Sequence, residues 1–178
     1  LREDASSKPR DVERRWRGVT SFSVMGPFAE FGSAAHDDCF APESRCDFAA
    51  EHSGLYGALR WKPLPHFDHT DDHLNLDLHA RHAGSCYYAA TILRSEKSGE
   101  ATLRIDVDCP AKVWLRGAPL IDIDTRRFDF PQIYMNARLD QGDNLLLVKL
   151  SERSRLRVRI CAKSGQQIPG LTATAPVQ

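Results

Sequence analysis

The stretch GEATLRIDVDCPAKVWLRGAPLIDID, residues 99–124, constrains the fold of this chain more than any other segment. Apolar and polar residues alternate along its first half, so the apolar ones share one face of a strand. Those apolar residues are Ala101, Leu103, Ile105 and Val107. A turn at 108–110 follows, AKVWLRG returns the chain, and Arg116 and Gly117 form a second turn. The pattern predicts an antiparallel strand pair joined by a tight turn.

The same two-residue period recurs along much of the chain. It is strict in LNLDLH (74–79) and in RLRVRI (155–160), whereas CYYAATILRS (86–95) and NLLLVKL (144–150) are apolar almost throughout. A continuous apolar run of this length is typical of a central strand. We therefore expect about eight short strands and little helix, in an all-β antiparallel sandwich or jelly roll. A parallel α/β sheet would need crossover helices, for which the sequence leaves no place.

Composition divides the chain into three expected parts. Residues 1–18 are charged and predict a linker or a loosely packed segment, residues 19–165 the sandwich, and residues 166–178 an unpacked tail with Pro169, Gly170 and Pro176. VTSFSVMGPF (19–28) predicts the first strand. Residues 29–60 show no sustained period and predict a long surface excursion, a feature that is often functional.

Charge and hydropathy exclude two classes of partner. The 24 basic and 24 acidic side chains give a formal charge of zero. The chain therefore has no net positive charge that would favour binding to nucleic acid or to an anionic membrane. No apolar run approaches the ~18 residues of a membrane span. The first residues lack the apolar region of a signal peptide and an initiator Met, from which we expect a piece of a longer protein.

The five cysteines leave the redox state open. No CxxC pair is present, which argues against a zinc ribbon. Cys39 and Cys46 are close enough in sequence to form a disulfide within one loop, and the alternative is buried thiols that act as small hydrophobes. An odd number of cysteines leaves at least one thiol in a monomer.

Several segments, in their order along the chain, resemble a known family. They are VMGPF, FAPE, GLYGALRW, YYAATILRSEKSGEATLRI, KVWLRG and LDQGDNLLLVKL. Together, over residues 19–162, they resemble the galactose-binding-like jelly-roll accessory domains of bacterial polysaccharide-degrading enzymes. These domains are similar to the sugar-binding domain of the β-galactosidase and β-glucuronidase families.

The resemblance implies a binding or accessory role and no catalytic site. It implies a non-catalytic, carbohydrate-binding or accessory module of a larger, secreted or periplasmic protein, with a glycan or an adjacent catalytic domain as partner. The alternative is a structural or protein-interaction domain without sugar affinity. The sequence departs from the family pattern in two places. Arg116 replaces the family's usual Asn, which tolerates a left-handed turn better. Residues 106–110 replace the family's usual Ser-Asp-Asp-Gly turn, so a cation site that an acidic pair forms there in relatives is in doubt for this chain.

The candidate carbohydrate-binding residues lie in or beside the excursion. They are His36, Asp38, Tyr56 and Trp61. Polar groups would address sugar hydroxyls and an aromatic side chain would cover the apolar face of a ring. Trp61 has the alternative of a place in the core.

A second set of residues predicts a face for a partner. Trp114, Leu145 and Leu147 alternate with the apolar residues expected in the core, so they point outward toward sugar, a neighbouring domain or the segment that carries Trp16. Arg155, Arg157 and Arg159 share one face of the last strand and would pair with carboxylate or sulfate of an acidic polysaccharide or partner surface. The alternative is a solvated outer face.

Metal and cofactor signals are weak. His66, His69, His73, His79 and His82 fall within seventeen residues, interleaved with aspartates. Because they follow Pro65 in an expected loop, we interpret them as polar loop residues rather than as a metal site. We expect no catalytic residues, no metal site and no cofactor; a structural calcium ion is not readable from the sequence. The motifs GxSxG, Walker A, HExxH and GxGxxG are absent.

Overall fold

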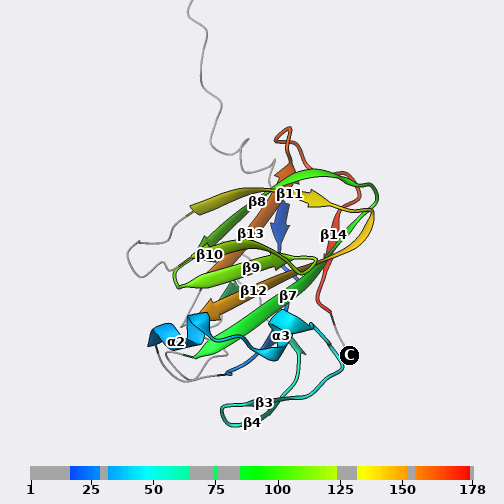
Figure 1. The fold of residues 1–178 in the computed structure, drawn as a ribbon. Coiled ribbons are helices and arrows are strands. Elements are labelled where there is room, and N and C mark those ends of the chain that lie inside the picture. Colours follow the sequence, from blue (N-terminus) through cyan, green and yellow to red (C-terminus); the bar gives the residue numbers. More distant parts are fainter. Residues whose placement is uncertain are drawn as a thin grey trace, which may run out of the picture.

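The computed structural model describes residues 17–28, 32–64, 74–75, 85–123, 132–151 and 155–176. These residues form an antiparallel β-sandwich with two short helices, α2 (Gly32–Asp37) and α3 (Ala41–Ser44) (Figure 1). The all-β sandwich class expected from the sequence is confirmed. Several strands of two or three residues accompany the longer ones, and runs of this length are too short to produce a period in the sequence.

The first sheet has five strands. In spatial order it contains β1 (Arg17–Val19), β13 (Arg155–Ala162), β8 (Gly99–Val107) and β11 (Gln132–Leu139), and β6 (Leu74–Asn75) also pairs with β13. All of these pairs are antiparallel. β11 forms an edge of this sheet among the described residues.

The second sheet has seven strands. Its order is β10 (Ala118–Ile123), β9 (Ala111–Leu115), β12 (Gly142–Ser151), β7 (Cys86–Ser95), β2 (Ser23–Met25) and β5 (Lys62–Pro63), and β14 (Thr172–Thr174) also pairs with β7. β7 and β12 match the two apolar runs of the sequence and lie at the centre of this sheet. A separate hairpin consists of β3 (His52–Gly54) and β4 (Gly57–Leu59).

The main core lies between the two sheets. The alternating apolar residues of β8 face those of β9 and β12, and all are buried. Thus the two-residue period does define the inward face, as expected.

The expected strand pair at 101–115 is wrong in one respect. β8 belongs to the five-stranded sheet and β9 to the seven-stranded sheet, so the two strands do not pair. The turn at 108–110 carries the chain from one layer to the other, with Cys109 and Pro110 buried. Alternation reveals which face of a strand is buried, but not which strand is its hydrogen-bonding neighbour.

The second turn of that stretch forms as the sequence predicts. Arg116 has φ 52° and Gly117 has φ 77°, and they join β9 to β10 in a hairpin. Two residues with positive φ fit the right-handed twist of the flanking strands. Arg116 therefore occupies the left-handed conformation that an asparagine would tolerate better.

The expected single strand at 19–28 divides into two. β1 pairs with β13 in one sheet, whereas β2 pairs with β7 and β5 in the other. Phe22, between them, is buried in the main core. The chain changes layers within four residues, which is too short a distance to alter the apolar pattern.

The C-terminal segment is packed, and the expectation of an unpacked tail after Gly165 is wrong. Leu171 is 1% exposed and belongs to the main core. β14 pairs with β7, and the Ser23 hydroxyl donates a hydrogen bond to the Pro176 carbonyl. Two prolines and one glycine interrupt the apolar residues of this segment, so the sequence shows no regular alternation that would indicate its packing.

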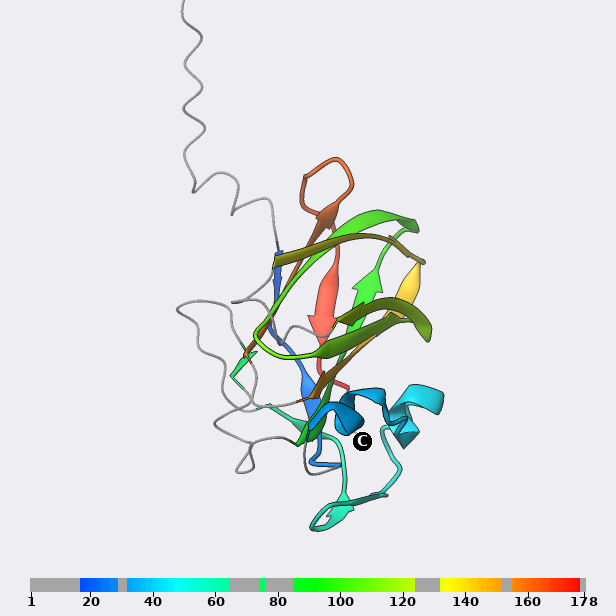
Figure 2. The ribbon, with the colours of Figure 1, turned by 60° about the vertical axis from the view of Figure 1, so that its left-hand side comes forward.

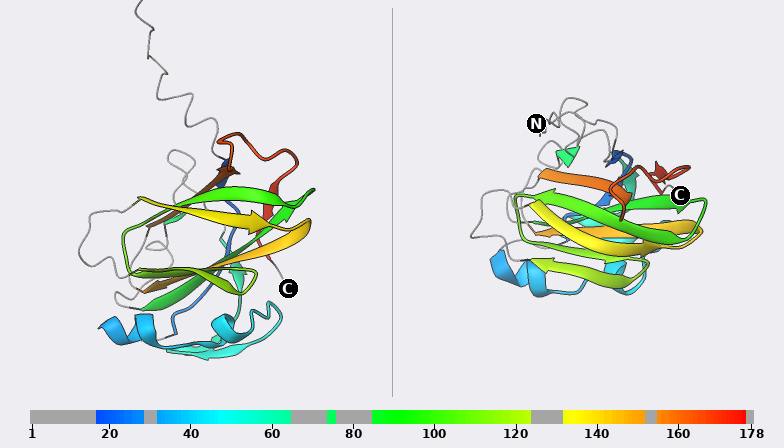
Figure 3. Two further views of the ribbon diagram at one scale, coloured as in Figure 1. Left: turned by 45° about the horizontal axis from the view of Figure 1, so that its top comes forward. Right: turned by 90° about the horizontal axis from the view of Figure 1, so that it is seen from above.

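The excursion forms a third layer. In Figure 3 (left), α2, α3 and the β3–β4 hairpin lie against the outer face of the seven-stranded sheet. Figure 2 shows the same elements on the sandwich from another side. A second apolar cluster fills the space between this layer and the sheet, and it includes Met25, Trp61, Tyr88 and Leu147.

Candidate functional site

The excursion is attached to the sheet by a buried ion pair. Lys149 of β12 is fully buried, and its Nζ donates to the carbonyls of His36 and Asp38 and to Glu43 Oε1, 2.9 Å away. The Tyr88 hydroxyl donates to the same carboxylate oxygen. Burial raises the pKa of Tyr88, so its hydroxyl stays protonated as a donor. A buried ammonium group is stable only with such partners.

His36 provides a second attachment. Its Nε2 lies 2.8 Å from Asp122 Oδ1 of β10, and its Nδ1 lies 3.4 Å from the Ser151 hydroxyl. Burial alone would raise the pKa of Asp122, but the hydrogen bond with His36 and the charge of Lys112 hold it below its usual value. His36 therefore fixes α2 onto the sheet and does not face solvent.

Aromatic side chains fill the rest of this interface. Phe28, Phe40 and Tyr88 contact one another at tilted or perpendicular angles, and Phe48 lies 5.2 Å from Trp61 between ring centroids. Trp61 is 5% exposed, and its indole N–H has no hydrogen-bond partner among the described residues. Trp61 is thus a core residue, the alternative noted for it above.

The four predicted carbohydrate-binding residues do not form one site. His36 and Trp61 are buried, whereas Asp38 is exposed and Tyr56 is 59% exposed at the turn of the β3–β4 hairpin. Long excursions often form binding loops, but this one packs through its own aromatic residues. Only Asp38 and Tyr56 remain accessible to a ligand.

The predicted partner face of β9 and β12 points outward, as expected, but the chain itself covers it. Leu147 is buried, and Trp114 and Leu145 pack partly buried against the cluster below the excursion. The expectation that Leu147 contacts a partner is therefore wrong, because Phe28 and apolar residues of 35–61 pack over that face. Trp16, the proposed cover, lies outside the described residues.

The three arginines of β13 differ in their exposure to solvent, so they form the predicted exposed row only in part. Arg155 is exposed, Arg157 is partly buried and Arg159 is buried. Arg157 and Arg104 each hold the buried Asp106, with N–O distances of 2.5 and 3.1 Å. Asp106 thus binds two guanidinium groups, which strengthens the doubt about a cation at 106–110.

A cavity lies at the other end of the sandwich. It has a volume of about 220 Å³ and lies between the β7–β8 turn and the C-terminal segment. Its lining residues are Ser95, Glu96, Lys97, Ser98, Gly99, Glu100, Leu139, Ala162, Ile168 and Pro169. One side is therefore polar and the other is apolar.

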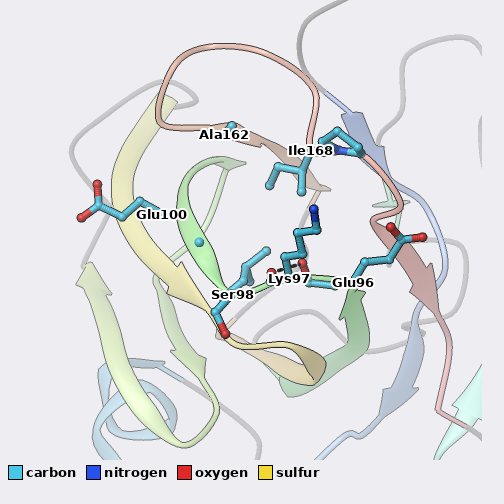
Figure 4. A pocket seen from close by; sticks show the side chains of 10 residues that line it. Glu96, Lys97, Ser98, Glu100, Ala162 and Ile168 are labelled. Carbon is cyan, nitrogen blue, oxygen red and sulfur yellow. Dashed lines mark hydrogen bonds between the residues drawn. The ribbon is translucent and has the colours of Figure 1, made fainter.

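The cavity is held in shape by hydrogen bonds of its rim. Ser95 Oγ donates to the Lys97 carbonyl at 2.8 Å, and the Gln141 N–H donates to Ser98 Oγ at 2.9 Å. In Figure 4, Lys97 extends toward Ile168 while the Glu100 carboxylate points away from the cavity. Glu100 pairs instead with Lys163 at 2.7 Å, and this hydrogen bond lowers its pKa.

Sequence reasoning missed the cavity because its walls come from separate segments. SEKSGE reads only as a turn between strands, and Ile168 and Pro169 lie in the segment interpreted as a tail. The concentration of serine, lysine and glutamate in that turn was the available signal.

The described residues show few signs of other sites. They contain no group of three or more potential metal ligands, and the histidine cluster at 66–82 lies outside them. None of the described helices is long and apolar enough to cross a membrane. All five cysteines are thiols, so of the two alternatives left open by the sequence, the Cys39–Cys46 disulfide does not form. Burial raises the pKa of Cys46 and of Cys86 to about 12.

Comparisons with known structures find partial likenesses. A PA14 domain of the antifreeze protein MpAFP has 9% identity and a TM-score of 0.37, covering 51% of this chain and 52% of that chain. A family 35 carbohydrate-binding module from Clostridium thermocellum has 14% identity and a TM-score of 0.36, covering 47% and 75%. An anti-sigma factor domain-containing protein has 12% identity and a TM-score of 0.48, covering 95% and 50%. This chain thus spans about half of the first and third structures, and no residue role is transferred from them.

Comparison with protein families gives the more specific result. No curated protein matches the sequence. The family model of α-L-rhamnosidase, domain D2, matches residues 75–157, just under half of the chain. The matched part includes the strands from β7 to β12 and so most of the sandwich. Over these residues the chain is similar to domain D2 of α-L-rhamnosidase, and this similarity supports the accessory β-sandwich domain that its sequence motifs resemble.

Proposed function

We propose that this chain is a carbohydrate-binding module of a larger carbohydrate-active protein and that it binds a single sugar residue in the cavity at the β7–β8 turn. The observation that carries this proposal is the cavity lining, which combines a polar rim with an apolar wall. Sites for small ligands combine the same two elements, since apolar surface supplies contact and a few polar groups supply orientation.

The size of the cavity limits the ligand. Its volume of about 220 Å³ is below the roughly 300–1,000 Å³ of sites for drug-sized molecules. One sugar ring at the end of a chain or on a branch fits this scale better than an extended oligosaccharide. Lys97 and Glu96 would donate to and accept from its hydroxyls, and Ile168 would contact its apolar face.

The chemistry of the cavity predicts weak binding. None of the described residues that line it is aromatic, so they offer no stacking contact of the kind that strengthens many sugar sites. We therefore expect a Kd near the millimolar range, about −4 kcal/mol. A module with this affinity contributes through its attachment to a catalytic domain, which raises the local concentration of glycan.

Affinity gel electrophoresis on a panel of polysaccharides tests the proposal. We expect at least one glycan to retard the chain, and the change Lys97→Met to reduce that retardation. Lys62→Met is the matched control, because Lys62 is an exposed lysine on β5 and does not line the cavity. Equal retardation of both variants and the unchanged chain would place the sugar elsewhere.

A structural or protein-interaction module is the second candidate. It is favoured by the β3–β4 hairpin, which presents the exposed Tyr56 beside an otherwise well-packed layer. An adjacent catalytic domain would be the partner of this surface. If no glycan retards the chain, and Tyr56→Ala weakens its association with the flanking domain of the full-length protein, this second function holds.

We place the protein outside the cell or in the periplasm. The relation of residues 75–157 to a glycoside hydrolase supports this location, because polysaccharide substrates are found there. A glycan or a catalytic domain remains the expected partner, and the absence of nucleic-acid and membrane partners remains a prediction from the net charge and the hydropathy.

A further inference from the structure

The outward row of β11 has an unusual composition for a strand at the edge of a sheet. Ile133, Met135, Ala137 and Leu139 face the core, and the residues between them face outward. These outward residues are Gln132, Tyr134, Asn136 and Arg138, and all four are exposed. Tyr134 is 56% exposed, so the row presents one large aromatic ring between two amides and a guanidinium group.

Neighbouring strands extend this row into a positively charged face. Tyr134 lies opposite Arg104 of β8, and Arg104 lies opposite Arg159 of β13. On β8, β11 and β13 the residues that point away from the core include five arginines, of which Arg159 is buried, and two carboxylates, the exposed Glu100 and the buried Asp106. The chain as a whole has a formal charge of zero. An excess of three positive charges on one face is therefore a local feature.

The arginine nearest to the exposed ring is held in place. Asp106 is fully buried and holds Arg104 from one side and Arg157 from the other. The Arg104 guanidinium carbon lies 5.7 Å from the centroid of the Tyr134 ring. A side chain fixed in this way loses little conformational entropy when a ligand binds, so the face is preorganised.

From this arrangement we propose that the outer face of β8 and β11 binds an acidic glycan, a chain of sugars that bear carboxylates. A sugar ring lies on Tyr134, the amides of Gln132 and Asn136 bond its hydroxyls, and Arg138 receives a carboxylate in a bidentate pair. Tyr134 and Arg138 are four residues apart on one strand, about 13 Å. The ligand therefore spans several sugar units and differs from the single ring proposed for the cavity.

The composition of the row favours a glycan over a protein surface. Cores of protein interfaces are enriched in apolar side chains, but the aliphatic residues of β11 all point into the sandwich. Amide groups offer donors and acceptors together, as sugar hydroxyls require. The positive face complements carboxylates and not a neutral polysaccharide.

Affinity gel electrophoresis of the full chain tests this proposal with three probes of known charge. Polygalacturonate supplies sugars with carboxylates, a neutral galactan supplies sugars alone, and poly-L-glutamate supplies carboxylates alone. We expect polygalacturonate to retard the chain most, with a weaker effect at higher salt. Equal retardation by galactan would overturn the acidic specificity, equal retardation by polyglutamate would indicate an acidic protein partner instead, and no retardation by polygalacturonate would refute the site.

Four variants locate the binding. We expect Tyr134→Ala and Arg138→Gln each to raise the apparent Kd for polygalacturonate by about tenfold, and Tyr134→Phe to retain most of the affinity through its ring. Arg60→Gln removes an exposed arginine that pairs with Glu51 away from β11, and it serves as the control for Arg138→Gln. Thermal unfolding checks that each variant is folded. If Tyr134→Ala binds as well as the unchanged chain, the proposal fails, whatever Lys97→Met shows for the cavity.

Discussion

Lys149 holds the excursion on the sandwich, and its replacement gives the sharpest test of the fold. The side chain is fully buried, and its Nζ contacts two backbone carbonyls and the Glu43 carboxylate. In Lys149→Met the apolar stem is kept but the charge is lost. Glu43, itself mostly buried, is then left with an uncompensated negative charge, and two carbonyls lose their donor.

The expected cost is large. Removing one partner of a buried ion pair destabilises a protein by about 3–5 kcal/mol. For a chain of this size each kcal/mol lowers Tm by about 2–4 °C, so we expect a decrease of about 10 °C. Adding Glu43→Gln should recover part of the loss, because the neutral amide no longer needs a counter-charge and still accepts from Tyr88.

Urea and thermal unfolding measure these differences, and Lys163→Met is the matched control. Lys163 pairs with Glu100 at 2.7 Å, but both side chains are more than half exposed, and such pairs contribute about 0–1 kcal/mol. Hydrogen exchange should show that the Lys149 variant loses protection first at 32–44. A cost below about 1 kcal/mol for Lys149→Met, or no rescue by Glu43→Gln, would show that the buried ion pair does not hold the excursion on the sheet.

Three further predictions concern other parts of the chain. Leu171→Ala should cost about 2–4 kcal/mol in urea unfolding because the C-terminal segment is in the core, and a loss below about 0.5 kcal/mol would mean that the segment is not packed. Asp122 has a lowered pKa, so its contribution to stability is present above its ordinary value of 3.8 and is lost as pH falls through the lowered value. Asp122→Asn should therefore make Tm fall less steeply at acid pH. The difference in unfolding free energy should be below about 1 kcal/mol, because the carboxylate is largely exposed. An unchanged fall in Tm would exclude the pair with His36. Iodoacetamide should label the exposed Cys39 well before Cys46, whose thiol stays protonated; a disulfide-linked peptide of the two would contradict the structure.

The faces of the strands could be predicted from the sequence, but their neighbours could not. Val113 and Leu115 point inward and Trp114 outward, as alternation requires. The assignment of β8 and β9 to different sheets depends on pairing between distant segments, such as β8 with β13 and β11. No local pattern records such pairs.

The candidate site was harder to predict because burial of the excursion is a tertiary effect. The sequence predicts His36 and Asp38 as sugar-binding residues of a surface excursion, yet their carbonyls accept hydrogen bonds from a lysine more than a hundred residues away. The strict alternation of QIYMNARL at 132–139 was a usable signal for Tyr134, since it places the ring on the outward face.

Chemical-shift mapping by NMR shows directly whether the chain binds glycan at the two proposed sites. The titrant is the polysaccharide that retards the chain most in affinity gels. We expect saturable shifts in two separate regions: in the cavity at 95–100 with Ile168, and in the outward row of β11 when the glycan is acidic. Shifts confined to the β3–β4 hairpin around Tyr56, or none with any glycan at millimolar concentration, would contradict it.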